Sequence, residues 1–280
     1  MTPLAVLADL IGDGGVVVLS GAGISTESGI PDYRGPAATA RRATPMSFQT
    51  FTGSRAAQQR YWARSHLGWG LISRAAPNDG HRAVAALQAR GVLAGIVTQN
   101  VDGLHTSAGA TDVLELHGNL EQVRCLDCGD LSPRTELDHR LRAANRGWSA
   151  PATVINPDGD VELTDVDGFR IVDCARCGGV LKPDVVFFGE NVPRDRVQAA
   201  FALVEAAGCL LVLGSSLTVM SGYRFVLRAT KLGIPVAIVN DGPTRGDAQA
   251  TVKIEGRLGE VLPGLVGYRT DQAIGSDCMA

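Results

Sequence analysis

Residues 16–34 read VVVLSGAGISTESGIPDYR, an apolar run followed by a turn of small residues and a polar loop. The run Val16–Ser20 predicts a fully buried strand of a parallel sheet. Gly21, Ala22 and Gly23 then predict a strand-to-helix turn whose backbone N–H groups can approach a pyrophosphate. Because the third glycine of the dinucleotide-binding motif is missing, an ordinary tight turn is an equal alternative.

The polar loop after this turn combines three ligand-binding types of side chain. Asp32, Tyr33 and Arg34 place a carboxylate, an aromatic ring and a guanidinium consecutively beside the predicted phosphate cradle. Loops of this content usually bind a ligand, which favours the ligand-binding interpretation of the turn.

Further along the chain, short apolar runs end at glycine or polar turns and alternate with helical patterns. This alternation is typical of a parallel sheet covered by helices on both faces. The predicted fold class is therefore α/β, with a doubly wound, Rossmann-like parallel sheet. The predicted strands are 16–20, 95–98, 113–116, 209–214 and 236–240, and the predicted helices are 56–66, 81–90, 194–207 and 221–232.

Residues 121–182 break the alternation, because they hold two Cys-x-x-Cys pairs and a Pro-, Gly- and Asp-rich segment with little core-forming pattern. We expect an inserted small zinc-ribbon/helical module at 121–182 within a Rossmann-like nucleotide-binding domain formed by 1–120 and 183–265. A lobe of helices and a cofactor loop is expected at about 35–78, and a C-terminal tail at 266–280.

The two Cys-x-x-Cys pairs predict a metal site. A tight turn followed by glycine aims both sulfurs of a pair at one tetrahedral ion, and Gly129 and Gly178 follow the two pairs. Four thiolates leave no open coordination position, so a zinc ion here is predicted to be structural. Disulfides are the alternative, which a reducing compartment disfavours. The predicted ligands are Cys125, Cys128, Cys174 and Cys177.

Small or polar residues follow each of the later predicted strands. In open parallel sheets ligands bind outside the carboxyl ends of strands, so these side chains can address a carboxamide and ribose hydroxyls. A polar helix cap is the alternative for TQNVDGLH at 98–105. His117 follows the third strand, where an imidazole can act as a base near neutral pH, although a lone histidine is usually inert. The other candidates are Gln99, Asn100, Val101, Asp102, Gly214, Ser215, Ser216, Asn240, Asp241 and Gly242.

Composition and charge exclude several classes of function. The formal net charge is -3, which argues against a broadly basic nucleic-acid surface. No run approaches the roughly 18 apolar residues of a membrane span. The N-terminal segment lacks the basic region of a signal peptide and predicts an amphipathic first helix. We therefore expect a cytoplasmic protein with no membrane partner and no specific nucleic-acid partner.

Taken in order, GAGIS, GIPDYR, TQNVDGLH, His117-Gly118, the two cysteine pairs, KPDVVFFGE, GSS and VN resemble the sirtuin family over about residues 4–263. Segments such as SGYRF resemble the lineage II sirtuins in particular. The resemblance implies an NAD-dependent protein-lysine deacylase that transfers the acyl group to ADP-ribose and releases nicotinamide. It further implies one structural Zn²⁺, acylated-lysine proteins as partners, and NAD bound between the sheet and the small module.

The resemblance also implies roles for individual residues. His117 becomes the general base, which accepts a proton from the ribose hydroxyls. The acylated peptide is expected to add a strand beside Gly189 and Glu190, with its lysine near Val186 and Phe188. The implied NAD contacts are Gly21, Ala22, Gly23, Ser25, Thr26, Asp32, Tyr33, Arg34, Gln99, Asn100, Val101, Asp102, Gly214, Ser215, Ser216, Asn240, Asp241, Gly242 and Leu258.

Tyr61 and Arg64 stand three apart in a predicted helix and so share one helical face. Sirtuins that remove acidic acyl groups carry a similar Tyr-x-x-Arg pair, so the resemblance predicts a preference for acidic or longer acyl chains over acetyl. The physical expectation is that an acetyl group leaves the guanidinium unpaired. The alternative is that Arg64 is a solvated helix residue and Tyr61 fills the core.

Three other functions use part of the same residue set. A protein mono-ADP-ribosyltransferase on the same fold would capture the ribose carbon with another nucleophile. An NAD-linked oxidoreductase is disfavoured, because no acidic residue ends a second strand about 20 residues after the glycine turn. A zinc-ribbon binding module would leave the strand-end residues unexplained.

Overall fold

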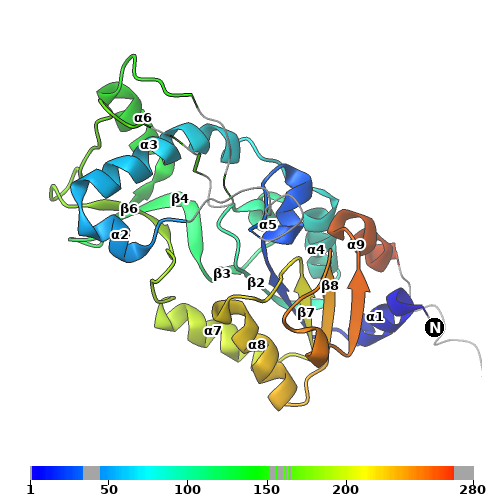
Figure 1. Cartoon of the computed structure of the whole chain (residues 1–280). Helices are drawn as coiled ribbons and strands as arrows, with labels where there is room; N and C mark the ends of the chain where they lie inside the picture. Colours follow the sequence, from blue (N-terminus) through cyan, green and yellow to red (C-terminus); the bar gives the residue numbers. More distant parts are fainter. Residues whose placement is uncertain are drawn as a thin grey trace, which may run out of the picture.

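The computed structural model describes residues 2–33, 45–151, 156, 160–161, 163 and 165–267. These residues form a six-stranded parallel sheet between two groups of helices, and a three-stranded antiparallel sheet that belongs to a smaller unit at one end of the molecule (Figure 1). The predicted fold class, α/β with a doubly wound Rossmann-like sheet and a small additional module, is confirmed. None of the described helices combines the length and the hydropathy that a membrane crossing requires.

The large sheet is built around β1, all of whose residues are buried because strands pair with it on both sides and helices cover both faces. The strand order is β3-β2-β1-β7-β8-β9, so the direction in which strands are added reverses between β1 and β7. Open α/β sheets bind their ligands at this switch point. The strands are β1 (Val16–Ser20), β2 (Leu93–Thr98), β3 (Val113–Glu115), β7 (Cys209–Leu213), β8 (Val236–Asn240) and β9 (Val252–Glu255).

Two groups of helices cover the two faces of this sheet. One apolar core joins the sheet to α1, α4 and α9, and a second core joins it to α7 and α8 (Figure 1). The helices are α1 (Pro3–Gly12), α4 (Asp79–Ala89), α7 (Arg194–Glu205), α8 (Met220–Lys231) and α9 (Leu258–Gly267). Three short helical segments lie in the connections: η1 (Ala22–Ser28), α5 (Leu104–Ser107) and η2 (Asp247–Gln249).

The smaller unit combines the sheet β5-β4-β6 with α2, α3 and α6 around an aromatic-rich core. Arg134 lies inside this core, with its guanidinium carbon 5.4 Å from the ring centroid of Trp62 and 5.1 Å from that of Trp69. These cation–π contacts offset part of the cost of burying the charge. The elements are α2 (Phe48–Gly53), α3 (Arg55–Ile72), β4 (Gly118–Cys125), β5 (Leu131–Pro133), α6 (Arg134–Ala144) and β6 (Leu181–Val185).

The predicted strands and helices correspond to observed elements whose ends differ by a few residues. The largest difference is in α3, predicted at 56–66 and observed at Arg55–Ile72, because Gly68 and Gly70 weaken the helical pattern of its last turns. Two of the elements without a predicted counterpart belong to the large sheet and its helices: β9 is only four residues long, and Pro263 interrupts the pattern of α9. Of the lobe expected at about 35–78, residues 35–44 lie outside the described part of the chain.

Candidate active site

The carboxyl ends of the central strands meet at one edge of the large sheet. The N–H of Gly21, after β1, donates to the Leu213 carbonyl on β7 at 3.0 Å, and the N–H of Gly214 donates to Val239 on β8 at 2.9 Å. The N–H of Gln99, after β2, donates to Ser20 on β1 at 3.0 Å. The candidate residues that follow these four strands are therefore neighbours in space.

Glycine is required where the turns after β1 and β7 touch. A Cβ atom at Gly21 would lie 2.8 Å from Ser215 Cβ, and a Cβ at Gly23 would lie 2.8 Å from the carbonyl oxygen of Gly214. The Gly23 N–H donates to that same carbonyl at 2.8 Å, and Gly214 itself has a φ of +59°. Backbone packing therefore demands these glycines, whether or not they also approach a phosphate.

Ser25, Asn100 and Asp102 form one hydrogen-bonded cluster above the turn. The Ser25 hydroxyl donates to Asp102 Oδ2 at 2.7 Å and accepts from Asn100 Nδ2 at 3.1 Å. Asn100 Nδ2 also lies 3.1 Å from the Gly21 carbonyl, and Asp102 Oδ1 accepts from the Leu104 N–H at 3.0 Å. Residues of the first and second predicted motifs, 77 positions apart, thus hold one another in place. The residue that precedes α5 is Gly103, so Asp102 is not its N-cap although it accepts from the first N–H of that helix, and the ligand-binding interpretation of this motif stays a prediction.

His117 lies beside this cluster and is anchored at both ring nitrogens. Its Nδ1 lies 2.9 Å from the carbonyl oxygen of Gln99, and its Nε2 lies 2.9 Å from Ser221 Oγ. A carbonyl oxygen only accepts hydrogen bonds, so Nδ1 carries the proton. Nε2 then presents its lone pair to the Ser221 hydroxyl.

The surroundings keep this imidazole neutral. Burial is the main cause that lowers the pKa of His117 to about 4, the positive charges of Arg224 and Arg196 act in the same direction, and the hydrogen bond to Gln99 opposes them. At neutral pH the Nε2 lone pair is therefore available to accept a proton, which a charged imidazole could not do.

The segment after β6 runs past His117. The Val186 N–H donates to the His117 carbonyl at 2.8 Å, so Val186 lies next to the candidate base. Glu190 closes the segment into a turn: its Oε2 accepts from the Phe187 N–H at 2.8 Å and pairs with Lys182 Nζ at 3.1 Å. Phe188 is 41% exposed and stacks edge-on to Tyr33, with ring centroids 5.9 Å apart.

Two of the remaining candidates make hydrogen bonds within the turns after β1 and β8, one is buried at the start of α9, and one lies outside the described residues. Thr26 donates to the Gly23 carbonyl at 2.9 Å, and Asn240 Nδ2 donates to the Gly242 carbonyl at 3.0 Å. Leu258 is only 2% exposed and begins α9. Arg34 lies outside the described residues.

The four cysteines of the two Cys-x-x-Cys pairs come together in the small module. Their sulfur atoms all lie within 4.8 Å of one another, and none of the cysteines in the described part of the chain forms a disulfide. Gly129 and Gly178 have φ angles of +73° and +74° and close the two turns by donating to the carbonyls of Cys125 and Cys174. Four convergent sulfurs fit a closed tetrahedral zinc site, as the sequence predicts.

Arg64 has a carboxylate partner within the protein. Its Nε lies 3.0 Å from Asp160 Oδ2, its Nη2 donates to Asp160 Oδ1 at 3.2 Å, and its Nε also donates to the Val161 carbonyl at 2.8 Å. The two side chains are 13% and 3% exposed. The expectation of a guanidinium without a protein carboxylate is therefore wrong, and so is the alternative of a solvated Arg64. Asp160 is 96 residues away from Arg64, in a segment without a core-forming pattern. No local sequence pattern therefore predicts that the two side chains pair.

Tyr61 is a core residue. Its side chain is 3% exposed, and its ring lies edge-on to Phe51 and Trp62 with centroids 5.4 and 5.2 Å away. It also lies 5.1 Å from the ring of Phe187, the neighbour of Val186 and Phe188. The core-filling interpretation is confirmed for Tyr61, which at the same time packs against the segment that passes His117.

Comparison with known proteins identifies the family. The model of the Sir2 family matches residues 21–221. The chain belongs to the Sir2 family. An "NAD-dependent protein deacetylase 1" of Streptomyces coelicolor is 60% identical over 93% of this chain and 88% of its own length. One of the same name in Mycobacterium avium is 53% identical over 88% of this chain and 89% of its own length. A solved structure described as Sir2 with a p53 peptide and NAD⁺ has a TM-score of 0.75 and 31% identity, and the match covers 94% of this chain and 96% of that one.

The Sir2 assignment agrees with the sirtuin resemblance, while the lineage II resemblance stays a prediction. Sequence patterns missed two polar residues that contact candidate site residues of this sirtuin: Ser221 contacts His117, and Asp160 pairs with Arg64. Ser221 is the second residue of α8, where a serine is unremarkable in sequence, and only the packing of the start of α8 against Gln99 shows its contact with His117.

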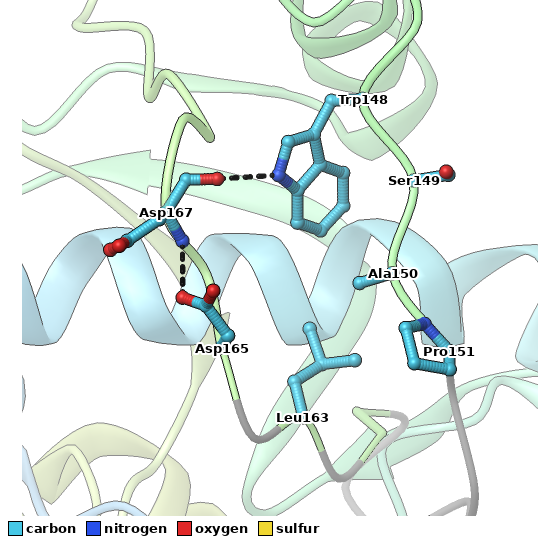
Figure 2. Close-up of a pocket in the computed structure, with 7 residues that line it drawn as sticks. All are labelled: Trp148, Ser149, Ala150, Pro151, Leu163, Asp165 and Asp167. Carbon is cyan, nitrogen blue, oxygen red and sulfur yellow. Dashed lines mark hydrogen bonds between the residues drawn. The ribbon is translucent and has the colours of Figure 1, made fainter.

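A small pocket of this sirtuin lies in the small module and contains none of the predicted site residues. It has a volume of about 130 Å³ and is bounded by Trp148, Ser149, Ala150, Pro151, Leu163, Asp165 and Asp167. Figure 2 shows Trp148 donating its indole N–H to the Asp167 carbonyl across this pocket, at 3.0 Å, beside α3. The pocket is too small for a dinucleotide, and the strand ends remain the candidate site.

Proposed function

We propose that this sirtuin is an NAD-dependent protein-lysine deacylase. The observation that carries the proposal is the position of His117: a neutral imidazole with a fixed tautomer lies at the carboxyl edge of the sheet, between a hydroxyl–amide–carboxylate cluster and the Val186 segment. The deacetylase names of close relatives support the same activity.

The polar residues at the strand ends suit NAD as the bound molecule. When bound, NAD supplies an electrophilic ribose carbon from which nicotinamide can leave. Gly21, Ala22 and Gly23 would hold its diphosphate, together with the hydroxyls of Ser25 and Thr26. The amide and carboxylate of Asn100 and Asp102 would address the carboxamide, and the residues after β7 and β8 would hold the adenosine half.

His117 would act as the general base at its Nε2 atom. The Gln99 carbonyl keeps the proton on Nδ1, so the lone pair always faces away from β2 and toward the start of α8. A hydroxyl of the ribose would give its proton to this lone pair, which lets the oxygen accept the acyl group. His117 does not have to release a proton before it acts, because its pKa of about 4 lies far below neutral pH and the imidazole is already neutral.

The acylated peptide would bind along the segment after β6. Phe188 and Gly189 are exposed there, so an extended chain can reach this stretch of backbone. The lysine would then enter beside Val186, whose backbone is hydrogen-bonded to His117. The cysteine cluster would hold one zinc ion that stabilises the small module and takes no part in the chemistry. Since such thiolates persist in a reducing compartment, we infer a cytoplasmic location.

Product analysis tests the proposal. The protein is incubated with NAD and a panel of acyl-lysine peptides, and the products are identified by mass spectrometry. Deacylation yields nicotinamide, free-lysine peptide and O-acyl-ADP-ribose in equal amounts. ADP-ribosylated protein together with intact acyl-lysine peptide would instead support the transferase alternative.

The acyl preference is a second question for the same experiment. An acidic acyl chain is expected to approach Tyr61 and Arg64, but in this protein its carboxylate must compete with Asp160 for the guanidinium. We infer that the preference for acidic or longer chains depends on how easily the acyl carboxylate can replace Asp160 as the partner of the Arg64 guanidinium.

A further inference from the structure

Ser221 occupies the one proton-accepting position of His117. The Gln99 carbonyl holds the proton on Nδ1, so a neutral imidazole has its only lone pair on Nε2. Ser221 Oγ lies 2.9 Å from this atom. The serine hydroxyl must be the donor in this contact, because Nε2 has no proton to give.

We propose that Ser221 is a positioning residue that caps the lone pair of His117 in the enzyme without substrate and releases it when a substrate hydroxyl arrives. The proposal rests on the proposed function, in which Nε2 accepts that proton. Two hydroxyls cannot donate along the same lone pair at once, so the ribose hydroxyl must take the place of Ser221. The cap holds the ring in its reactive orientation and keeps water from the base until then.

The position of the cap is set by the fold. Ser221 lies in the first turn of α8, and its neighbour Gly222 packs so tightly on Gln99 that a Cβ at Gly222 would lie 2.4 Å from Gln99 Oε1. Gln99 therefore holds both partners, His117 through its carbonyl oxygen and the start of α8 through its side chain. The contact between Ser221 and His117 follows from this shared support.

The cap also acts on the proton affinity of the base. A hydrogen bond donated to Nε2 stabilises the neutral imidazole and disfavours the protonated form. The charged groups that face His117 are Arg224 on α8 and Arg196 on α7, and both disfavour the protonated form as well. Removing the Ser221 hydroxyl while both arginines remain isolates its contribution.

NMR titration of the unliganded protein tests this directly. The chain contains only five histidines, so the His117 ring signals can be assigned by their loss in a His117→Asn variant. Ser221→Ala should raise the pKa of His117 by about 0.4 to 1 pH unit, the range that one net hydrogen bond supports. Ser221→Thr, which keeps the hydroxyl, should leave the pKa within about 0.2 pH unit of the original value, a shift well below that range.

Kinetics separate a cap from a general structural role. The pH dependence of kcat/KM reports the free enzyme, and that of kcat reports the enzyme–substrate complex. In Ser221→Ala the acid limb of kcat/KM should move to higher pH while the acid limb of kcat stays in place. An unchanged His117 pKa in Ser221→Ala, or equal movement of both limbs, overturns the proposal. A shifted pKa in a protein that deacylates no peptide would leave the cap standing and refute the proposed function instead.

Discussion

The imidazole rings of His81 and His105 meet edge-on inside the protein, with centroids 5.1 Å apart. His81 accepts the Asn78 N–H at Nδ1, so its proton is on Nε2, and His105 Nε2 lies 2.8 Å from Ser20 Oγ. The Ser20 hydroxyl donates to Thr98 Oγ1, which also accepts the Asn100 N–H. The cap of α4 is thus linked through buried polar groups to the backbone of Asn100.

Both histidines are held neutral, which predicts loss of stability in acid. Burial lowers the pKa of each to about 4 from the usual 6.5, so the unfolded chain binds more protons between these values. The free energy of unfolding should therefore be highest above pH 6.5 and fall as the pH drops toward 4. Each buried neutral histidine adds a slope of up to about 1.4 kcal/mol per pH unit in this window.

Chemical denaturation at several pH values measures this slope. His105→Gln should flatten it, because the variant lacks one of the groups that titrate on unfolding. The matched control is His139→Gln, which alters an exposed histidine of α6 and should leave the slope unchanged. A slope that responds equally to both substitutions would contradict the assignment to buried histidines.

Removing the candidate base should separate chemistry from binding. His117→Ala is expected to reduce deacylation at least 100-fold, within the range by which general base catalysis accelerates a reaction. NAD affinity should change little, because the phosphate cradle after β1 belongs to other residues. Calorimetric titration with NAD measures the affinity, and steady-state kinetics on an acetyl-lysine peptide measure the loss of deacylation. Full activity in this variant would remove His117 from the mechanism.

Loss of one cysteine should release the zinc and unfold the small module. Cys125→Ser or Cys174→Ser is expected to lower the zinc content from one per chain to near zero and to make the protein insoluble, because binding is coupled to folding. The matched control is Cys209→Ala, which alters a buried thiol on β7 outside the cluster and should retain the metal. Elemental analysis measures the zinc content, and centrifugation of the expressed protein measures its solubility. A soluble, active, zinc-free variant would refute the assignment of a closed structural zinc site.

Substitutions of Arg64 and Asp160 should change acyl selectivity in opposite directions. Asp160→Asn removes the competing carboxylate and should raise the ratio of glutaryl to acetyl kcat/KM. Arg64→Met should lower that ratio about tenfold or more, since a hydrogen bond to a charged group contributes about 1.5–3 kcal/mol. Arg60→Met, at an exposed position of the same helix, serves as the control. If Arg64→Met leaves the ratio unchanged, the preference for acidic chains is wrong.

Several parts of this protein could be predicted from local patterns. The strand Val16–Ser20 is a continuous apolar run because it is buried on both faces, and such a run needs no knowledge of its neighbours. The two Cys-x-x-Cys turns are also local, because the glycine that follows each pair is what allows the turn. The same holds for the residues that follow each strand, since parallel topology alone brings them to one edge.

By itself, then, the sequence determined the α/β class, the carboxyl edge that carries the candidate site and the four cysteines that converge, because all of these depend on short-range periodicity and turn chemistry. Only the tertiary structure decided which side chains pair within that frame. Ser221 meets His117 across 104 residues and Asp160 meets Arg64 across 96. Such pairs depend on the angle and distance at which whole helices and segments pack, and no local pattern of residues contains that information.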